Sequence, residues 1–228
     1  GQVVYGSRPP KKEKLYWLIE YLKGQMEDLG VEIRLNHAPT VEEIKALNPY
    51  AVFVAQGSKP IKPASIPGID GENVYTPEDI LSGNVKLRGK RVAVIGSGMT
   101  GIEIADLLGE QGNDVSIFEM EDEVGPGMFF QNLIDVMKRI EKHGIKLYPK
   151  HKLIAIEGTT VVTEKTDTKE VKKFDFDAVV LSLGIEPNNE LIDELKLEFD
   201  KVILIGDAKK GGKIGNAIAS GYKEAFEL

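Results

Sequence analysis

The chain has 228 residues, of which 42% are hydrophobic and 29% are charged, and this length and composition suit a globular protein of one large or two small domains. The net charge of −7 argues against nucleic-acid binding, and the absence of cysteine excludes a dithiol centre, a cysteine-ligated zinc and an iron–sulfur cluster within this chain. No segment resembles a signal peptide and no apolar run reaches membrane-spanning length, so a cytoplasmic location is the default expectation.

Regular patterns appear early in the chain, after a loop-like start over Gly1–Pro10. They predict an amphipathic helix over 15–29, a half-exposed strand over 31–36, a short helix with a capping box at 40–43, and a buried strand over 51–55. Residues 61–84 are rich in proline and glycine, which predicts a connector between domains. Within it, Thr76 has the character of an N-cap for another short helix.

A short apolar strand runs directly into a glycine-rich turn and a helix in the middle of the chain. Residues 92–95 have the pattern of a buried strand, and Ile102, Ala105 and Leu108 then recur at helical spacing. The glycines between them match the G-x-G-x-x-G pattern that holds a dinucleotide pyrophosphate at a helix N-terminus. The alternative is a glycine turn without a nucleotide. The candidate cofactor-binding residues of this turn are Gly96, Ser97, Gly98, Met99, Thr100 and Gly101.

An acidic residue suited to an adenosine ribose follows at Glu119, after the predicted strand over 115–118. Its offset from Gly101 is close to the roughly 20 residues expected of a group that hydrogen-bonds the ribose. Residues 121–123 are also acidic and no lysine or arginine is nearby in the sequence. A 2′-phosphate should therefore be repelled, which favours NAD(H) over NADP(H). Glu103 has two equal interpretations, as a residue lining the nicotinamide side or as an acid favoured by the helix dipole.

The rest of the chain alternates between strand and helix patterns. These predict a helix with Phe129, Leu133, Val136, Met137 and Ile140 on its buried face, short strands over 145–148, 153–156, 160–163, 171–174 and 178–183, a helix over 189–195, a strand over 202–205, and a closing helix from Ile214. The strands between 153 and 174 could form an antiparallel meander. His37, His143 and His151 are scattered, and we expect each to be a surface or packing residue rather than a catalytic one.

A second candidate site lies at Gly206 and Asp207, directly after the last predicted strand. Ligands of open α/β sheets bind beyond the carboxyl ends of the strands, so Asp207 could accept a hydrogen bond from a ribityl or ribose hydroxyl. An equally good interpretation is a solvated aspartate that caps a helix. Likewise, Gly57 either allows a ligand to approach the backbone closely or only makes a turn.

Several motifs in the same order resemble those of the flavin-dependent pyridine-nucleotide oxidoreductases, which have the pyridine nucleotide-disulfide oxidoreductase type of fold. The chain is most similar to the carboxy-terminal part of the NADH:flavin oxidoreductases related to dienoyl-CoA reductase, enoate reductase and trimethylamine dehydrogenase. Besides the glycine turn, the similar segments are Gly1–Gln2, Val31–Asn36, Ala55–Ser58, Ile66–Ile69, Gly184–Asn188 and Ile205–Ala208, with Ala217 and Gly221 in the closing helix.

This resemblance implies an α/β fold in which a Rossmann-like NAD(H)-binding domain is inserted into a partial FAD-binding-type domain. The implied bounds are 1–60 and 190–228 for the FAD-binding-type part, 61–84 for the connector and 85–189 for the NAD(H)-binding domain. The resemblance also implies that Gly57, Ser58, Gly184, Gly206 and Asp207 belong to the cofactor-binding residues.

Parts of the family pattern are missing from the chain. The first FAD glycine motif is absent, Gln56 replaces the usual threonine, and Tyr50 stands where an aspartate is usual. The family's barrel, with its FMN, iron–sulfur cluster and substrate acid, would lie upstream on the same polypeptide. We therefore interpret the chain as a fragment of a larger enzyme. Its expected partners are the dinucleotide and that barrel, with neither nucleic acid nor membrane among them.

The expected function is that of the NADH-binding, flavin-reducing portion of an oxidoreductase. NADH on the glycine turn would pass hydride to FAD held by the other domain, and neither a catalytic side chain nor a metal ligand is expected in this chain. One alternative is an isolated NAD(H)-binding module that never holds FAD. Another is a complete NADH-dependent disulfide or ferredoxin reductase. The lack of cysteine disfavours the disulfide reductase, and the missing FAD glycines disfavour both.

Overall fold

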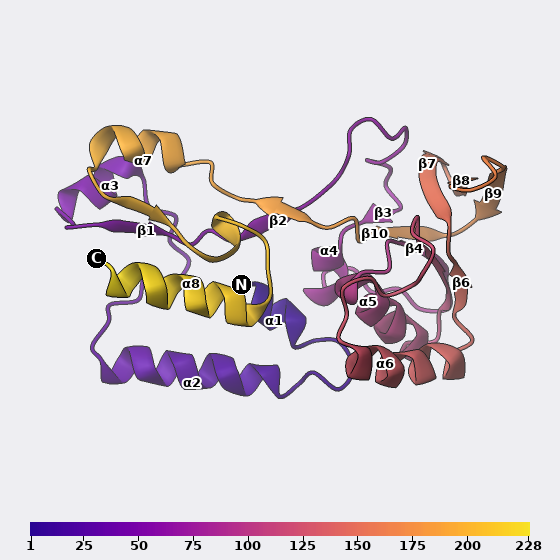
Figure 1. Cartoon of the computed structure of the whole chain (residues 1–228), viewed down its shortest axis with the longest axis horizontal. Helices are drawn as coiled ribbons and strands as arrows, with labels where there is room; N and C mark the ends of the chain where they lie inside the picture. Colours follow the sequence, from indigo (N-terminus) through magenta and orange to yellow (C-terminus); the bar gives the residue numbers. More distant parts are fainter. The chain divides into compact units, whose positions relative to one another are not determined.

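The computed structural model describes all 228 residues, and the chain divides into two compact units. Unit 1 comprises Gly1–Val3, Tyr16–Lys59 and Ile185–Leu228, and unit 2 comprises Val4–Leu15 and Pro60–Gly184. Figure 1 shows the elements of both units along the chain. None of the helices combines the length and the apolar character that crossing a membrane requires.

Unit 2 is built on a five-stranded parallel sheet with the strand order β3-β10-β4-β5-β6. The strands are β3 (Val74–Tyr75), β10 (Ala178–Leu181), β4 (Arg91–Ile95), β5 (Asp114–Phe118) and β6 (Lys146–Tyr148). In the centre of the sheet, Val94 of β4 lies beside Val180 on one side and Ile117 on the other. Continuous apolar runs are expected in strands that are covered on both faces. The buried strands predicted over 92–95, 115–118 and 178–183 are confirmed, the last with a shorter extent.

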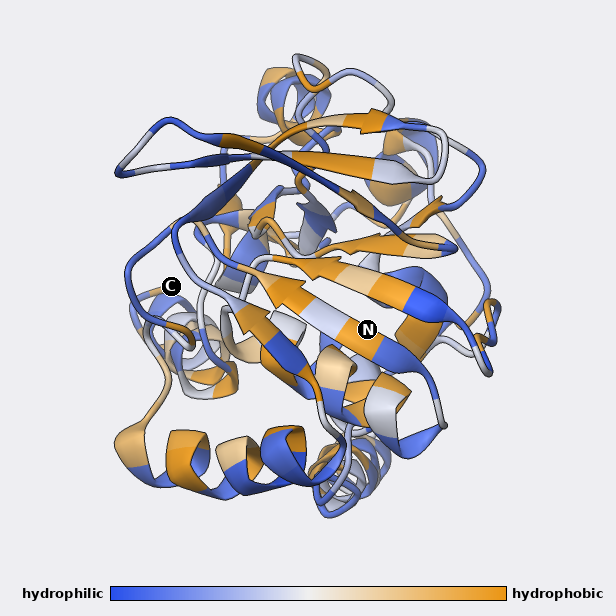
Figure 2. Ribbon diagram, turned by 90° about the vertical axis from the view of Figure 1, so that its right-hand side faces the viewer, coloured by the Kyte–Doolittle hydropathy of each residue, from blue (hydrophilic) through white to orange (hydrophobic).

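Side chains of this sheet alternate between two apolar layers, because successive residues of a strand point to opposite faces. Val92 and Val94 pack with α4 (Pro77–Leu81), α5 (Met99–Glu110) and α6 (Phe130–Lys142). Ala93 and Ile95 pack on the other face with the antiparallel sheet of β7 (His151–Glu157), β8 (Thr160–Lys165) and β9 (Val171–Asp175), which confirms the predicted meander. In Figure 2 the apolar strands lie between the helices and this antiparallel sheet.

The helix ends follow the local sequence signals. At α3 (Val41–Ala46), the Glu43 amide donates to Thr40 Oγ1 at 3.2 Å and the Thr40 amide donates to Glu43 Oε2 at 2.8 Å, which is the predicted capping box. Thr76 caps α4 in the same way through Asp79. After α6, the chain leaves the helix at Gly144, whose φ of 66° suits a glycine at this position.

Unit 1 has a smaller core than unit 2. β1 (Val52–Val54) pairs in parallel with β12 (Val202–Leu204), and β2 (Ser58–Pro60) pairs with β11 (Ile185–Pro187). The other elements with residues in unit 1 are α1 (Gln2–Gly6), α2 (Leu15–Asp28), α3, α7 (Ile192–Glu198), the 3₁₀ helix η1 (Gly206–Ala208) and α8 (Ile214–Phe226). The buried apolar residues of this core are Val41, Val54, Ile192 and Leu195.

Three sequence predictions are wrong. The start of the chain is not only a loop, because Gln2–Gly6 forms α1. The strand expected over 31–36 is not formed, because no strand of the chain offers a backbone partner, and Val31, Ile33 and Leu35 are 45%, 49% and 79% exposed. Phe129 is 61% exposed rather than on the buried face of α6, because it is the N-cap residue of that helix.

Asn113 is a buried polar residue of unit 2, with 6% of its surface exposed. Its side chain joins three backbone positions of this unit. Its Nδ2 donates to the carbonyls of Leu87 and Leu108 at 2.9 Å each, and its Oδ1 accepts from the Lys90 amide at 3.1 Å. All its amide hydrogens and its oxygen are therefore used within the fold, where they join the start of β4 to the end of α5.

We expect Asn113→Ala to lower the free energy of unfolding by about 2–3 kcal/mol, because buried backbone groups would lose their partners. Urea denaturation would measure the change. The exposed Asn84 provides the control, since Asn84→Ala should change the free energy by less than about 0.5 kcal/mol. Equal effects of the two substitutions would contradict the structural role of Asn113.

Candidate functional site

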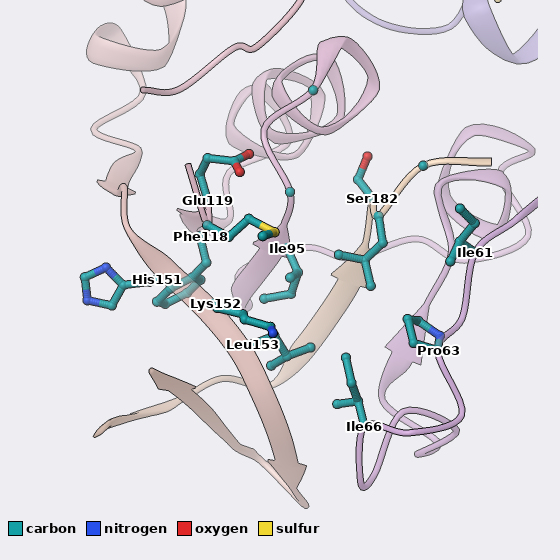
Figure 3. A pocket seen from close by; sticks show the side chains of 15 residues that line it. Ile61, Pro63, Ile66, Ile95, Phe118, Glu119, His151, Lys152, Leu153 and Ser182 are labelled. Carbon is teal, nitrogen blue, oxygen red and sulfur yellow. The ribbon is translucent and has the colours of Figure 1, made fainter. Parts of the chain in front are cut away.

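A pocket with a volume of about 420 Å³ lies at the carboxyl ends of the central strands of unit 2 (Figure 3). The lining residues are Ile95, Gly96 and Gly98 at the end of β4, Phe118, Glu119 and Met120 at the end of β5, His151, Lys152 and Leu153 of β7, Ser182, Leu183 and Gly184 after β10, and Ile61, Pro63 and Ile66. The volume is that of a small-molecule site, and this end of a parallel sheet is where ligands of such folds bind.

The three glycines of the β4–α5 turn differ in whether the fold could accommodate a side chain at their positions. Gly96 has a φ of 94°, and a Cβ there would lie 2.2 Å from the Ser182 carbonyl oxygen. A Cβ on Gly101 would lie 2.0 Å from the Gly96 carbonyl oxygen. At Gly98 a Cβ would meet nothing within 4 Å, and the φ of −56° is open to any residue. The fold therefore requires Gly96 and Gly101, whereas Gly98 leaves open space in front of the backbone.

That open space lies at the N-terminus of α5. Gly98 is the N-cap residue, and no side chain caps the first turn of the helix. The first amides of a helix have no partners within it, and the helix dipole places partial positive charge at this end. Met99 and Thr100 follow in the first turn with exposed side chains that do not line the pocket. The turn is thus suited to an anion that approaches the backbone closely.

Glu119 is the buried acid of the pocket, with 5% of its surface exposed. Its Oε2 accepts from the Ser97 amide at 2.8 Å and from Ser97 Oγ at 2.6 Å, and its Oε1 accepts from the Glu121 amide at 3.0 Å. Burial alone raises the pKa of Glu119, but the hydrogen bonds from Ser97 and the backbone amides outweigh it and lower the pKa. The carboxylate is therefore charged at neutral pH and directly bonded to the glycine turn.

Glu103 lies on α5 but does not line the pocket. Its side chain is 12% exposed and forms an ion pair with Lys12. Burial raises the pKa of Glu103, and the opposing effect of Lys12 does not cancel that increase. A second ion pair follows one turn later, where Arg139 Nε lies 2.7 Å from the buried Asp106 Oδ2. Glu103 therefore belongs to the partly buried ion pairs of α5, with Lys12 as its partner, rather than to the pocket wall.

Sequence reasoning missed the contribution of β7 to this pocket. The His151 amide donates to the Glu119 carbonyl at 2.7 Å, and the Lys150 amide donates to the Glu121 carbonyl at 2.9 Å. These bonds bring Lys152 to the pocket and place Lys150 within 3.6 Å of Asp122. No lysine or arginine follows Glu119 closely in the sequence, but the fold brings Lys150 and Lys152 to this part of unit 2. No local signal could reveal this, because the two segments are separated by α6 and β6.

The remaining candidates lie in two places. Gly184 lines the pocket of unit 2, where its carbonyl accepts from the Ile61 amide at 3.1 Å. Gly57 and Gly206 belong to unit 1, each beyond the end of one of the paired strands β1 and β12, and have φ values of 76° and 56°.

Two polar candidates stand next to these glycines of unit 1. Ser58 is 9% exposed, and its Oγ accepts from Gln2 Nε2 at 3.4 Å. Asp207 Oδ1 accepts from the Gly212 amide at 3.0 Å, so this carboxylate closes the loop that precedes α8. The structure thus places both residues beyond the same pair of strands.

Comparison with known proteins places this geometry in a family. Residues 41–208 match the family model described as pyridine nucleotide-disulphide oxidoreductase. The chain is 34% identical to an NADH oxidase of Thermoanaerobacter brockii and 32% identical to a cinnamate reductase of Clostridium sporogenes, over 100% of this chain and 35% and 34% of the relatives. It therefore spans about a third of the length of these curated relatives.

A solved structure of 2-naphthoyl-CoA reductase in complex with 2-naphthoyl-CoA has the same fold. It matches with a TM-score of 0.92 and 28% identity, over 100% of this chain and 34% of that chain. Thioredoxin reductase of T. acidophilum, at 21% identity and a TM-score of 0.63, shares the fold. The predicted resemblance and the Rossmann-like α/β fold are confirmed, and the chain belongs to the pyridine nucleotide-disulphide oxidoreductase family.

Proposed function

We propose that this chain is the portion of a flavin-dependent oxidoreductase that binds NADH and directs its hydride to FAD. The observation that carries the proposal is the pairing of an open helix N-terminus at Gly98 with the buried, charged Glu119 on the neighbouring strand. These two groups match the two polar parts of an adenosine diphosphate moiety, the pyrophosphate and the ribose.

The pyrophosphate would lie against the backbone at the start of α5. Gly98 leaves room for it, and the first amides of the helix would donate hydrogen bonds to its oxygens. Ser97 is fully buried and joined to Glu119, so its hydroxyl supports the turn rather than the ligand. The anion would thus be held by backbone groups that the fold has already oriented.

The ribose would lie at the end of β5, where Glu119 would accept hydrogen bonds from its hydroxyls. Carboxylates accept such bonds most strongly when ionised, and the lowered pKa keeps Glu119 in that form. The strand order then orients the dinucleotide. Because β10 lies on the other side of β4 from β5, the nicotinamide half would extend toward Ser182 and Gly184.

Unit 1 would hold the flavin through residues beyond its paired strands. Gly57 has open space around it, and the second carboxylate oxygen of Asp207 makes no hydrogen bond within the protein. When bound, the nicotinamide would supply the hydride and the flavin would accept it, while this chain supplies binding, orientation and electrostatics. Because the two cofactors would carry out the hydride transfer, no acid–base side chain of the pocket needs a catalytic role.

The surface of unit 1 supports the further proposal that the chain is part of a larger enzyme. Trp17, Tyr222 and Phe226 are 68%, 73% and 80% exposed, although aromatic side chains of this size are usually covered. By the family resemblance, the missing part would be an upstream barrel with FMN and an iron–sulfur cluster, which would take electrons onward to the substrate.

A binding module without FAD is the second candidate, and the internal hydrogen bonds of Ser58 and Asp207 favour it. Absorbance near 450 nm would separate the two candidates. If FAD added to the protein stays bound through gel filtration and is bleached by NADH without oxygen, the flavin-reducing function holds. If NADH binds but FAD does not, the binding module is correct.

The glycine turn provides a prediction about ligand access. Gly98→Ala should leave the free energy of unfolding within about 1 kcal/mol of the wild type and weaken NADH binding at least about tenfold, because the methyl group would fill the open space. Gly96→Ala should instead destabilise the protein by at least about 2 kcal/mol, because of its positive φ and the contact with Ser182. NADH fluorescence titration and urea denaturation test the pair. Unchanged NADH affinity in a folded Gly98→Ala variant would refute the pyrophosphate assignment.

Glu119 provides a prediction about discrimination between cofactors. The wild type should bind NADH more tightly than NADPH, and Glu119→Gln should weaken NADH binding about tenfold and reduce the difference, because charge-assisted hydrogen bonds to the ribose would be lost. Fluorescence titration with both nucleotides measures the two affinities. Equal or tighter NADPH binding by the wild type would contradict the assignment of Glu119 to the ribose.

The lowered pKa of Glu119 predicts the pH dependence of binding and stability. Because the folded-state pKa lies below the ordinary value of 4.5, the stability from the ionised carboxylate is complete above that value and is lost as the pH falls through the folded-state pKa. ADP-ribose affinity, measured by calorimetry, should therefore be constant from about pH 8 to pH 5 as far as Glu119 is concerned. The wild type should lose affinity for ADP-ribose when Glu119 becomes protonated at acid pH, and Glu119→Gln should not show this loss. An affinity that already declines from pH 7 in the wild type, but not in this variant, would contradict the lowered pKa.

A further inference from the structure

The pocket of unit 2 contains three titratable side chains, and only one of them has no partner. Glu119 is engaged by Ser97 and a backbone amide. His151 is 7% exposed, and its Nδ1 lies 2.7 Å from the Pro149 carbonyl oxygen. Lys152 is exposed, lines the pocket, and has neither an ion pair nor a hydrogen bond within the chain. A free cation in a ligand pocket is available to an anionic group of the ligand.

The backbone determines which end of the pocket this cation occupies. The hydrogen bonds from residues 150 and 151 to residues 121 and 119 place the start of β7 beside the end of β5. Figure 3 shows Lys152 entering the pocket from the side that carries Phe118, with its side chain directed toward Leu153 and with Ser182 on the opposite side. The proposed pyrophosphate position, at the start of α5, lies beyond the end of the neighbouring strand β4. Lys152 therefore enters the pocket from the side assigned to the adenosine ribose.

NADH has no anionic group at its adenosine ribose, whereas NADPH carries a phosphate on the 2′ oxygen. From this juxtaposition we propose that Lys152 sets the cofactor selectivity of the pocket, by pairing with the 2′-phosphate of NADPH and so offsetting the repulsion from Glu119. The pocket then prefers NADH but also accepts NADPH. This inference rests on the proposed function, because it requires a dinucleotide in the pocket with its ribose at Glu119.

The neighbouring charges are consistent with a special role for this lysine. Lys150, two residues earlier, is already paired with Asp122 at 3.6 Å and Asp167 at 3.4 Å, and it does not line the pocket. The net effect on a 2′-phosphate is therefore decided between the anion of Glu119 and the cation of Lys152, the two charged groups of the pocket wall.

Lys152→Gln tests the inference, with Lys150→Gln as the matched control. Dissociation constants for NADH and NADPH would be measured by fluorescence titration at low salt and at high salt. Lys152→Gln should raise the ratio of the NADPH to the NADH dissociation constant about fivefold, which is the strength of an exposed ion pair. Lys150→Gln should leave this ratio unchanged, because its charge is used by Asp122 and Asp167. The difference between wild type and Lys152→Gln should vanish at about 1 M salt, where exposed charges are screened.

Smaller ligands isolate the contribution of the phosphate. Adenosine 2′,5′-bisphosphate and 5′-AMP differ only in the 2′-phosphate, so the wild type should lose less affinity for the bisphosphate relative to 5′-AMP than Lys152→Gln does. An unchanged NADPH to NADH ratio in Lys152→Gln overturns the inference, as does an equal change in Lys150→Gln. Wild type that binds NADH but no NADPH also overturns it. Wild type that binds neither nucleotide refutes the proposed function itself.

Discussion

The hydrogen bonds between Glu119 and Ser97 are the interaction on which the candidate site depends. They join the end of β5 to the turn after β4, so the two strand ends that define the pocket are held as one structure. Gly125 adds to this group, since its amide donates to Ser97 Oγ at 3.1 Å and ties down the loop before α6. A buried carboxylate with these donors remains charged, and on the proposed function this charge accepts hydrogen bonds from the hydroxyl groups of a ribose.

The layers of unit 2 keep this arrangement rigid. Both faces of the central sheet are covered, by helices on one side and by the β7–β9 sheet on the other. Phe118, directly before Glu119, stacks on Tyr148 with ring centroids 4.8 Å apart and meets Phe174 edge-on. These aromatic contacts hold Phe118 in place and thereby limit the movement of Glu119, the next residue in the chain. Tight packing around a site is what allows its polar groups to be oriented before a ligand arrives.

Unit 1 contrasts with unit 2 in how much of its apolar surface is covered. The residues of β12 are only half-buried, and α2 and α8 contain no buried residue. A parallel sheet normally has both faces covered. The contrast between the units agrees with the fact that the chain spans about a third of the length of its relatives. Residues 31–36, which have a strand pattern in the sequence, form no strand in this unit.

The sequence by itself determined the strand–turn–helix unit around Gly96–Gly101 and the caps at Thr40 and Thr76. It also identified Glu119 as a candidate cofactor-binding residue. Each of these signals is local, because helix caps, tight turns and buried strands depend on residues a few positions apart. The family resemblance could also be recognised from short motifs in order. These parts of the fold needed no knowledge of which segments come together.

Only the tertiary structure decided which residues share the pocket and which are separated. It brought Lys152 into the same pocket as Glu119 through backbone bonds between β7 and the segment after β5. It also placed Glu103, for which the sequence left two interpretations open, in an ion pair with Lys12 and outside the pocket wall. It also left residues 31–36 without a partner strand. The physical reason is the same in each case: strand pairing and side-chain contacts join segments far apart in the chain, and local sequence patterns carry no information about those partners.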